Sequence, residues 1–505
     1  MKQTTSHPVT HAMTGQSSAA WKNIAAAGAF AVIAILAVRH QINLLSYALW
    51  QDETETIVAA KMLANGYRLY SEVFNHHGPL TFGPAYILEE LRSSGVYGHR
   101  IQIAALQWLT IASVLFSPLM KGKPLYLKSI LGAAMATVVF GFLPENFAHM
   151  QTYQGLCGML VAAILAQYVL PSIIQPGRSS NAQVFTGNAL IACLIFLATT
   201  YALAALALAL AAFRSQHARP ALAGLLAGAG FNLVFLAWIG SVPGYLAQAI
   251  YLNSAIMPKY LDLGPITLLF NALGAITRDA AALSVFAGAV LGLNALARYE
   301  GGQWPWRWAL VGVALGSFLV RGFFTHELPY LYGVLTLLLL VGLRRPLSVV
   351  SAGVLMAAII LVACVKLLPL LSADKQRIAR GQIPNDTEFA ALARKLTEPD
   401  DRIIAYSFNN FDYLMAKRLP ASGQFFYLPW QADLERKPVL GVQLDACADI
   451  HKAMPKVMQL DQWRVWGLYR WESYGQCIQQ LADTHYVKLE GKPYYVRKDV
   501  AEKGL

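Results

Sequence analysis

Residues 24–55 read IAAAGAFAVIAILAVRHQINLLSYALWQDETE, a mainly apolar run that ends in a row of acids. One helix needs about 20 apolar residues to cross a bilayer, and this run supplies that length. Asp52 and Glu53 follow the run directly, where the apolar slab meets water. Acidic side chains at this depth are costly and usually functional. The sequence therefore predicts a membrane-spanning helix that brings carboxylates to one surface of the membrane.

The whole chain has the composition of a membrane protein. Of its 505 residues, 56% are hydrophobic and 13% are charged, which does not fit a soluble chain. The net charge of +12 at pH 7 does not indicate a nucleic-acid partner, because many of the cations flank apolar runs, where membrane topology places them. The sequence has no P-loop, zinc motif or dinucleotide fingerprint, which argues against a soluble nucleotide donor bound inside the cell.

Apolar runs of spanning length predict an α-helical polytopic membrane protein with about eleven transmembrane helices. The predicted spans are Ile24–Tyr47, Arg100–Met120, Tyr126–Leu143, Gly155–Ile174, Gly187–Thr200, Tyr201–Phe213, Ala221–Gly240, Asp279–Ala297, Trp308–Val320, Leu328–Leu343 and Leu347–Leu371. The apolar stretch divided at Thr199–Thr200 is long enough for one tilted helix and short for two. The predicted total of eleven spans, which places the two ends of the chain on opposite sides of the membrane, requires that this stretch be two helices.

Lysine and arginine gather in short cytoplasmic loops, so their positions predict the orientation. With the N-terminus inside, the cytoplasmic turns contain the cation groups Lys121–Lys128, Arg178, Arg214–Arg219, Arg298–Arg307 and Arg344–Arg345. The longer loops and the C-terminal tail then lie outside. We expect a multi-pass protein of the bacterial cytoplasmic (inner) membrane with its external parts in the periplasm.

The chain divides into two predicted domains. Residues 1–371 hold the spans and the first external loop, residues 48–99, which carries amphipathic helices. Residues 372–505 have lower hydropathy and alternate short apolar pieces with helix-like ones, which predicts an external α/β domain. Cys447 and Cys477 lie in this domain. In an oxidising compartment they could form a disulfide, and two free thiols remain the alternative.

Asp52 has two possible roles. A carboxyl group at the edge of the membrane loses solvation, which raises its pKa and makes it a useful general base near neutral pH. Alternatively, Asp52 caps an amphipathic helix that Gly66 ends. From composition alone, the cap is the better interpretation.

The wider pattern favours the first role. Trp50–Glu53, Gly66–Tyr70 and His77–Leu80, followed by Arg100 at the start of the next span, resemble the glycosyltransferase C (GT-C) superfamily. These membrane transferases use polyprenyl-phosphate sugars and include protein mannosyltransferases and the aminoarabinose transferases of lipid A. The resemblance covers the full plan of the chain, from the acidic first loop through the spans to the C-terminal external domain.

The resemblance implies roles for the acids. Asp52 matches the family's acidic residue after the first span, the base that deprotonates the acceptor, and Glu53 completes the pair. The family's second acidic position follows the third span, where this chain has Pro144–Glu145–Asn146. Glu145 is therefore the second catalytic candidate, although it could instead simply end a helix beside Pro144.

The resemblance also implies a site for the donor phosphate. Many members have an aromatic residue or histidine followed by Leu-Pro near the lipid phosphate, and this chain has Arg321 and His326 before Leu328–Pro329. Both side chains can donate to phosphate, and Lys259 and Arg100 are further candidates. The alternative for Arg321 is that it only extends its charge to the membrane interface.

The sequence departs from the family where many members have Lys-Pro-Pro, because it has His77–Gly78–Pro79. His76, His77 or Arg68 could replace the missing lysine, and we expect His76, His77 and Tyr70 to contact the acceptor or the sugar. Asp52 and Glu55 would share one helix face, an arrangement compatible with a divalent metal. Hard cations usually need several carboxylates, so the sequence favours a reaction without a cofactor.

The predicted reaction is the inverting transfer of a hexose or pentose from a polyprenyl-phosphate donor to a periplasmic glycan, lipid or protein, with Asp52 as base. A secondary transporter of a polar or lipid-linked solute is the alternative, although the sequence lacks the repeat-related halves typical of transporters. A scaffold protein would not explain why the acids and histidines of the candidate site are all predicted on the external side.

Overall fold

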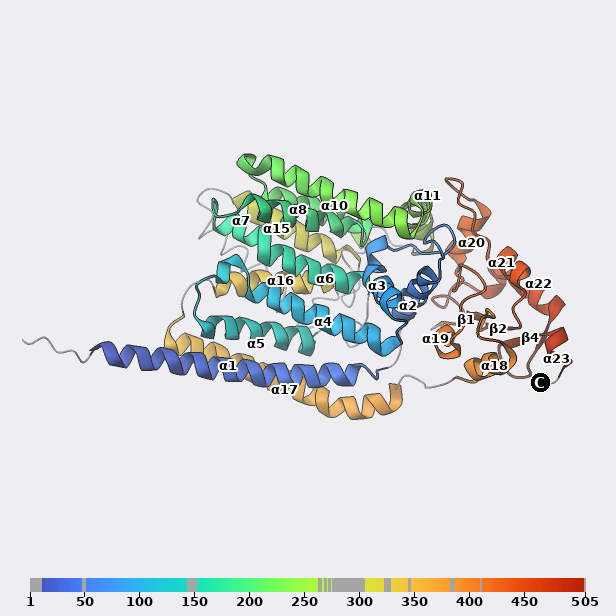
Figure 1. Ribbon diagram of the computed structural model, residues 1–505, viewed down its shortest axis with the longest axis horizontal. Coiled ribbons are helices and arrows are strands. Elements are labelled where there is room, and N and C mark those ends of the chain that lie inside the picture. The colour runs from blue at the N-terminus through green and yellow to red at the C-terminus, as the bar shows by residue number, and fades with distance from the viewer. Residues whose placement is uncertain are drawn as a thin grey trace, which may run out of the picture.

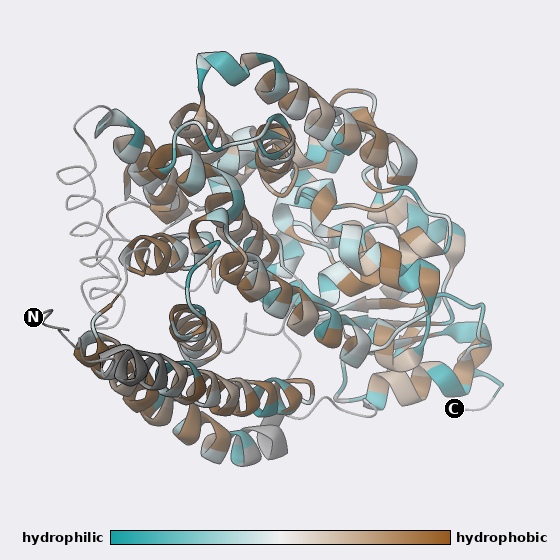
Figure 2. Ribbon diagram, turned by 60° about the vertical axis from the view of Figure 1, so that its left-hand side comes forward, coloured by the Kyte–Doolittle hydropathy of each residue, from teal (hydrophilic) through white to brown (hydrophobic). Residues whose placement is uncertain are grey.

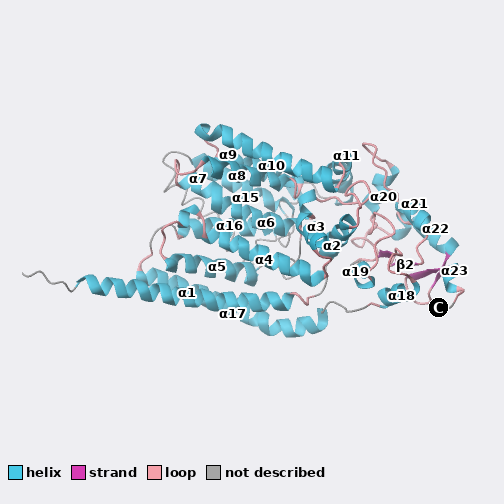
Figure 3. Cartoon of the chain, in the orientation of Figure 1, coloured by secondary structure: helices cyan, strands magenta, loops and turns pink. Residues whose placement is uncertain are grey.

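The computed structural model describes residues 11–47, 51–142, 152–261, 266–267, 270, 274, 305–321, 328–343, 347–381, 387–408 and 411–503. Long helices run side by side through most of the molecule, and the strands with several short helices lie together at one end of them (Figure 1). Among the described residues, Figure 3 shows the strands in that end unit. The long-helix part is called the bundle below, and the part that contains the sheet is called the α/β unit.

The bundle follows the predicted spans closely. Its main helices are α1 (His11–Leu44), α4 (Val96–Leu115), α5 (Leu125–Phe142), α6 (Tyr153–Ile164), α7 (Leu170–Ile174), α8 (Asn181–Ile195), α9 (Ala202–Ala212), α10 (Ala218–Ile239), α15 (Pro305–Ser317), α16 (Leu328–Gly342) and α17 (Val349–Gly381). Five π-helical residues join α6 to α7. The predicted span Asp279–Ala297 lies outside the described residues, so the count of eleven stays a prediction.

Four helices among the described residues are long and apolar enough to cross a membrane: Ala20–Leu44, Tyr153–Ile174, Ser215–Ile239 and Val349–Asp374. Shorter apolar helices include Asn181–Ile195 and Thr199–Ala212, which the structure separates near Thr199 as the sequence predicted. The bundle ribbons are mainly hydrophobic in colour, whereas polar residues are frequent in the α/β unit (Figure 2). Helices that are apolar on their outer faces as well as inside are typical of a membrane domain.

Small residues let the bundle helices approach closely. Gly224 and Gly228 on α10 face α8, and a Cβ atom at these positions would lie 2.2 Å from the Phe185 carbonyl oxygen and 2.4 Å from the Ala189 carbonyl oxygen. Two glycines four residues apart form the small-xxx-small pattern that membrane helices use for tight packing.

The α/β unit contains a four-stranded sheet in the order β1 (Ile404–Tyr406), β2 (Val457–Leu460), β4 (Tyr494–Arg497) and β3 (Tyr486–Lys488). The β1–β2 pair is parallel, with Ile404 opposite Met458, and the other two pairs are antiparallel. The helices of the unit are α18 (Glu388–Leu396), α19 (Asp412–Ala416), α20 (Pro429–Arg436), α21 (Ala446–Ala453), α22 (Gln476–His485) and α23 (Lys498–Ala501). The domain boundary predicted at residue 371 falls inside α17, which continues to Gly381. The boundary therefore stays a prediction.

A disulfide joins Cys447 on α21 to Cys477 on α22, with their Cα atoms 6.1 Å apart. The two cysteines are separated by 30 residues, so the bridge removes much of the freedom of that segment in the unfolded chain. The other cysteines, Cys157, Cys193 and Cys364, are free.

The α/β unit packs on the loop that follows α2 (Gln51–Ala64). The Phe74 amide donates to the Gly423 carbonyl at 3.0 Å, and the Phe74 ring meets Phe426 edge to face at 5.8 Å. A Cβ at Gly423 would lie 1.5 Å from the Glu72 carbonyl oxygen. Only glycine therefore allows this approach, and residues of the loop and the unit form one hydrophobic core.

Replacing Cys447 and Cys477 by alanine should destabilise the α/β unit by about 3–4 kcal/mol, the value expected for a closed loop of roughly 30 residues. Thermal unfolding of the detergent-solubilised protein, followed by tryptophan fluorescence, measures the effect. Reducing agent should lower the midpoint of the wild type to the same extent. Cys364→Ala is the control, since that cysteine is free. A wild-type unfolding midpoint that does not change with reducing agent would contradict the Cys447–Cys477 disulfide.

Candidate active site

Helix α2 (Gln51–Ala64) carries the acids that follow the first span. Asp52 and Glu53 lie in its first turn, where the positive end of the helix dipole stabilises negative charge. Asp52 is half-buried, whereas Glu53 and Glu55 are buried. Three carboxyl groups therefore enter the protein within about one turn of helix.

Burial changes the acid strength of two of these groups. Loss of solvation raises the pKa of Asp52 to about 6. Burial, reinforced by the neighbouring charge of Asp52, raises the pKa of Glu55 to about 8, although a hydrogen bond from Asn75 opposes the rise. A carboxyl group with a pKa near 6 is ionised at neutral pH and accepts a proton more readily than an exposed aspartate does.

Glu53 has a different environment, because it pairs with Arg100 on α4. The Arg100 guanidinium donates from Nε and Nη2 to the two carboxylate oxygens of Glu53, both at 2.7 Å. Its Nη1 donates to the carbonyls of Leu44, Leu45 and Tyr47 at 2.8–3.1 Å. Both side chains are almost completely buried. The pair ties α4 to the end of α1 and to the start of α2, the corner that carries Asp52.

Removing one member of this pair should destabilise the protein by about 3–5 kcal/mol, because the other charge is left buried without its partner. We expect this loss for Glu53→Met and for Arg100→Met, and a smaller loss for the double variant that combines these two changes. Thermal unfolding in detergent, with the three variants analysed as a double-mutant cycle, measures the coupling.

The opposite result would assign Arg100 to the donor. If Arg100→Met unfolds like the wild type but no longer retains polyprenyl phosphate, the guanidinium binds the phosphate, as the family resemblance implied.

A tight loop faces the acids of α2. Asn75 donates from Nδ2 to Glu55 Oε1 at 2.6 Å and accepts from the His77 amide at 2.9 Å. Tyr70 donates its hydroxyl to the His77 carbonyl at 2.6 Å. Gly78 presses on the corner between α8 and α9, where a Cβ would lie 2.1 Å from the Phe196 carbonyl oxygen. Position 78 therefore has no room for a side chain.

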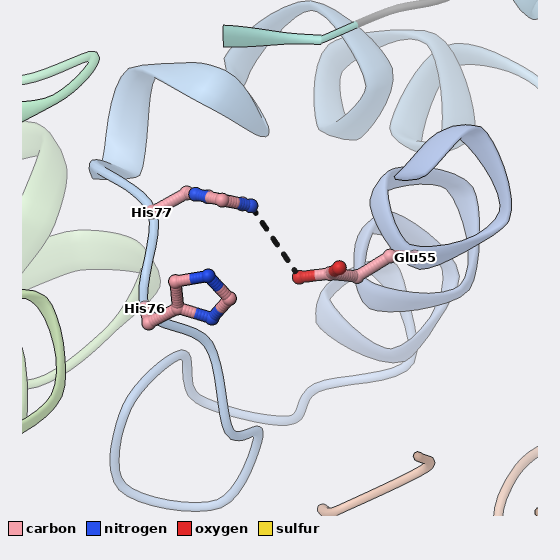
Figure 4. Close-up of side chains that lie close together, drawn as sticks. All are labelled: Glu55, His76 and His77. Atoms are coloured by element: carbon pink, nitrogen blue, oxygen red, sulfur yellow. Dashed lines mark ion pairs between the residues drawn. The ribbon is translucent and has the colours of Figure 1, made fainter. Parts of the chain in front are cut away.

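Glu55, His76 and His77 form a cluster of possible metal ligands. One ligand atom from each lies within 4.8 Å of the other two, and the side chains point toward one another across the gap between α2 and the loop (Figure 4). The distance from His77 Nε2 to Glu55 Oε1 is 3.9 Å, longer than a hydrogen bond. Imidazole and carboxylate are ligands that Zn²⁺ and related divalent ions accept. The three residues fit such an ion.

An aromatic row leads from this cluster into the bundle. The His77 ring lies 4.5 Å from the ring of Tyr153 at the start of α6, and Tyr153 lies 6.2 Å from Tyr201. Tyr201 in turn meets Phe318 edge to face at 5.3 Å. Phe318 begins the short helix that ends at Arg321. The row therefore connects the loop with the segment that carries the predicted phosphate-binding arginine.

The structure describes only part of the remaining predicted site residues. Glu145 and His326 lie outside the described residues, and the side chain of Arg321 is not described. Lys259 is exposed on α12 (Met257–Leu261). Its neighbour Tyr260 donates to the Pro429 carbonyl of the α/β unit at 3.2 Å. Within the described part of the chain, the loop brings Tyr70, His76 and His77 to the acids of α2.

Sequence reasoning missed two residues that shape the site, Asn75 and Gln248. Asn75 stands directly before the two histidines, and its proximity to them was the available signal. Gln248 lies 173 positions after Asn75 in a mainly apolar stretch. Its contact with the loop depends on how the chain folds, so the sequence offered no signal for it. Glu55 was considered in the sequence only as a partner of Asp52, whereas the structure pairs it with Asn75 and His77.

Comparison with known proteins supports the fold. No protein-family model and no curated protein matches the sequence. ArnT from Cupriavidus metallidurans bound to undecaprenyl phosphate is similar in structure, with 13% identity, a TM-score of 0.56 and coverage of 92% of this chain and 96% of that one. Its apo state gives 12% identity with the same TM-score and coverage.

The oligosaccharyltransferase AglB from Archaeoglobus fulgidus, in complex with an inhibitory peptide and a dolichol-phosphate, has 12% identity and a TM-score of 0.47 over 85% of this chain and 69% of that one. The likeness to ArnT over most of both chains shows that the two proteins share a fold.

Proposed function

We propose that the protein is an integral-membrane glycosyltransferase that moves a sugar from a polyprenyl-phosphate donor to an acceptor, with Asp52 as general base. One observation carries the proposal: in a chain with this fold, a half-buried aspartate whose pKa is raised to about 6 directly follows the first span. General bases work best when their pKa lies near the working pH. The ArnT structure with undecaprenyl phosphate supports the class of donor.

The proposed reaction takes place on the periplasmic side of the bacterial inner membrane. Helix α2, its facing loop and the α/β unit lie at the same end of the bundle (Figure 1). The Cys447–Cys477 bridge supports an oxidising compartment for that end. The acceptor is a glycan, lipid or protein exposed there.

The proposed chemistry is one displacement. The acceptor hydroxyl forms a bond to the anomeric carbon and passes its proton to an Asp52 carboxylate oxygen. The bond from the anomeric carbon to the phosphate oxygen breaks with its electron pair, and polyprenyl phosphate leaves. One displacement inverts the anomeric configuration. Holding both reactants in a water-poor site supplies much of the rate.

Cations compensate the charge of the leaving phosphate. We assign this role to Arg321, His326 and Lys259, with Glu145 as a second acid beside the acceptor. We assign Arg100 and Glu53 to positioning, since the guanidinium holds the carboxylate and three carbonyls of the α1–α2 corner. We propose that His76 and His77, which face Glu55 on α2, contact the sugar or the acceptor, and that the buried Tyr70 supports them through its hydrogen bond to the His77 carbonyl.

The cluster of Glu55, His76 and His77 is proposed to hold one divalent transition-metal ion. The sequence favoured a reaction without a cofactor, but the two imidazoles supply ligands that carboxylates alone did not. A bound ion would supply positive charge to a site that buries two acids. Asp52 keeps the role of proton acceptor in either case.

Asp52→Asn should reduce turnover by about a hundredfold to ten-thousandfold, the usual contribution of general-base catalysis, with unchanged thermal stability. Mass spectrometry of purified protein supplied with bacterial polyprenyl-phosphate lipids and acceptor, scored as loss of the sugar-loaded species, measures turnover. In the wild type, kcat/KM should fall about tenfold per pH unit below about 6, because Asp52 then becomes protonated and can no longer accept a proton.

Asp400→Asn, a change of an exposed aspartate in the α/β unit, is the matched control and should keep full activity. Normal turnover by Asp52→Asn would reject Asp52 as the base. A wild type that consumes no donor, yet moves solute in response to an ion gradient, would favour the transporter.

Purified wild type should retain about one divalent ion per chain, since three convergent ligands suffice for a catalytic-type site. Glu55→Gln combined with His76→Asn and His77→Asn should lose this ion. Elemental analysis by mass spectrometry after dialysis counts the ion without any need for activity. His451→Asn, in an exposed histidine of the α/β unit, is the control. Equal metal content in all three proteins would exclude the site.

A further inference from the structure

The external segment after α10 packs against the loop that carries the histidines. It consists of α11 (Val242–Tyr245) and the helix η6 (Leu246–Ile256), whose backbone is π-helical over 11 residues. π-Helical segments are rare in proteins, and those that occur often lie at functional sites. A Cβ at Gly244 would lie 2.5 Å from the Tyr70 carbonyl oxygen. The absence of a side chain there lets the segment come close enough for hydrogen bonds to the loop.

Gln248 on η6 holds two points of the loop with one side chain. Its Nε2 donates to the Tyr70 carbonyl at 2.7 Å, and its Oε1 accepts from the Asn75 amide at 2.9 Å. Gln248, Tyr70 and Asn75 are all fully buried. A planar amide holds its donor nitrogen and its acceptor oxygen at a fixed spacing, so the two bonds set the distance between the two ends of the turn.

The held conformation is one that the loop would not adopt readily by itself. Tyr70 has a φ of 67°, in the left-handed region that residues with a Cβ disfavour. Such a conformation persists when the surrounding structure over-determines it. The Gln248 bond to the Tyr70 carbonyl and the bond from the Tyr70 amide to the Val73 carbonyl at 2.7 Å supply that constraint.

A second amide of the same helix reaches the histidines themselves. Asn253 donates from Nδ2 to the His76 carbonyl at 2.7 Å. The His77 carbonyl accepts from the Tyr70 hydroxyl. Because Asn75 also binds Glu55 through its side chain, a shift of the Asn75 backbone would move both the histidines and their contact with α2.

We infer that Gln248 is a positioning residue for the proposed site: its side-chain amide fixes the turn from Tyr70 to Asn75 and so holds His76 and His77 opposite the acids of α2. This inference rests on the proposed function for its catalytic consequence. The geometric part, that Gln248 orders the loop, is independent of that function.

The test compares Gln248→Leu, which removes both hydrogen bonds at nearly constant volume, with Gln248→Glu, which keeps the oxygen that accepts from Asn75. Ser254→Ala is the matched control, since Ser254 is exposed on the same helix. Hydrogen-deuterium exchange of the peptide that contains residues 70–80 reports the order of the loop. Steady-state kinetics report kcat and the KM for the polyprenyl-phosphate donor.

For Gln248→Leu we expect exchange in this peptide to accelerate at least tenfold, with α4 and α6 unchanged, and kcat to fall at least tenfold while KM for the donor stays within about twofold. Gln248→Glu should recover part of both losses. A role in folding alone would lower the amount of folded protein but would not separate kcat from KM.

Unchanged exchange in Gln248→Leu would overturn the inference, as would faster exchange with full kcat. If Gln248→Leu does not fold, Gln248→Glu carries the same comparison. A wild type without transferase activity would reject the proposed function alone. The exchange data would then still decide whether Gln248 orders the loop.

Discussion

The bidentate pair between Glu53 and Arg100 fixes the corner on which the site is built. At the end of the first span, Arg100 donates to the carbonyls of Leu44, Leu45 and Tyr47. A cation at a helix C-terminus is also favoured by the helix dipole. Glu53 neutralises the cation, which could not otherwise remain buried at low cost. The residue before Glu53 is Asp52, so the start of α2 has little freedom to move.

Three acids within about one turn of α2 have three separate environments. Glu53 is bound by a guanidinium, Glu55 by the amide of Asn75 with His77 nearby, and Asp52 is only half-buried. Groups of one type whose surroundings separate their proton affinities are suited to separate tasks. The order of burial explains the assignment: the least buried of the three is the one that an acceptor from outside could reach. The other two acids connect α2 to α4 and to the loop that carries His76 and His77, called the histidine loop below.

The sequence predicted what local patterns encode. Apolar runs predicted the bundle helices that the structure describes, including the division near Thr199. The alternating short segments predicted a C-terminal α/β domain, whose bounds stay a prediction. Asp52 could be chosen because it adjoins a span. The long-range contacts of the site could not be predicted, because Glu53 and Arg100 are 47 positions apart and Asn75 and Gln248 are 173 apart. Such contacts depend on how helices pack, which period and composition do not specify.

The histidine loop contacts the α/β unit, α2, η6 and the connection between α8 and α9. Consecutive amides in it serve different parts: that of Phe74 donates to Gly423 of the α/β unit, and that of Asn75 donates to Gln248 of η6. The Asn75 side chain then reaches Glu55 on α2, and the Gly78 amide donates to the Leu197 carbonyl between α8 and α9. A buried backbone group that loses its partner costs about 1–3 kcal/mol. Any movement of the α/β unit relative to the bundle must therefore either carry this loop with it or break these bonds. The positions of the two histidines that face Glu55 thus depend on how the α/β unit docks.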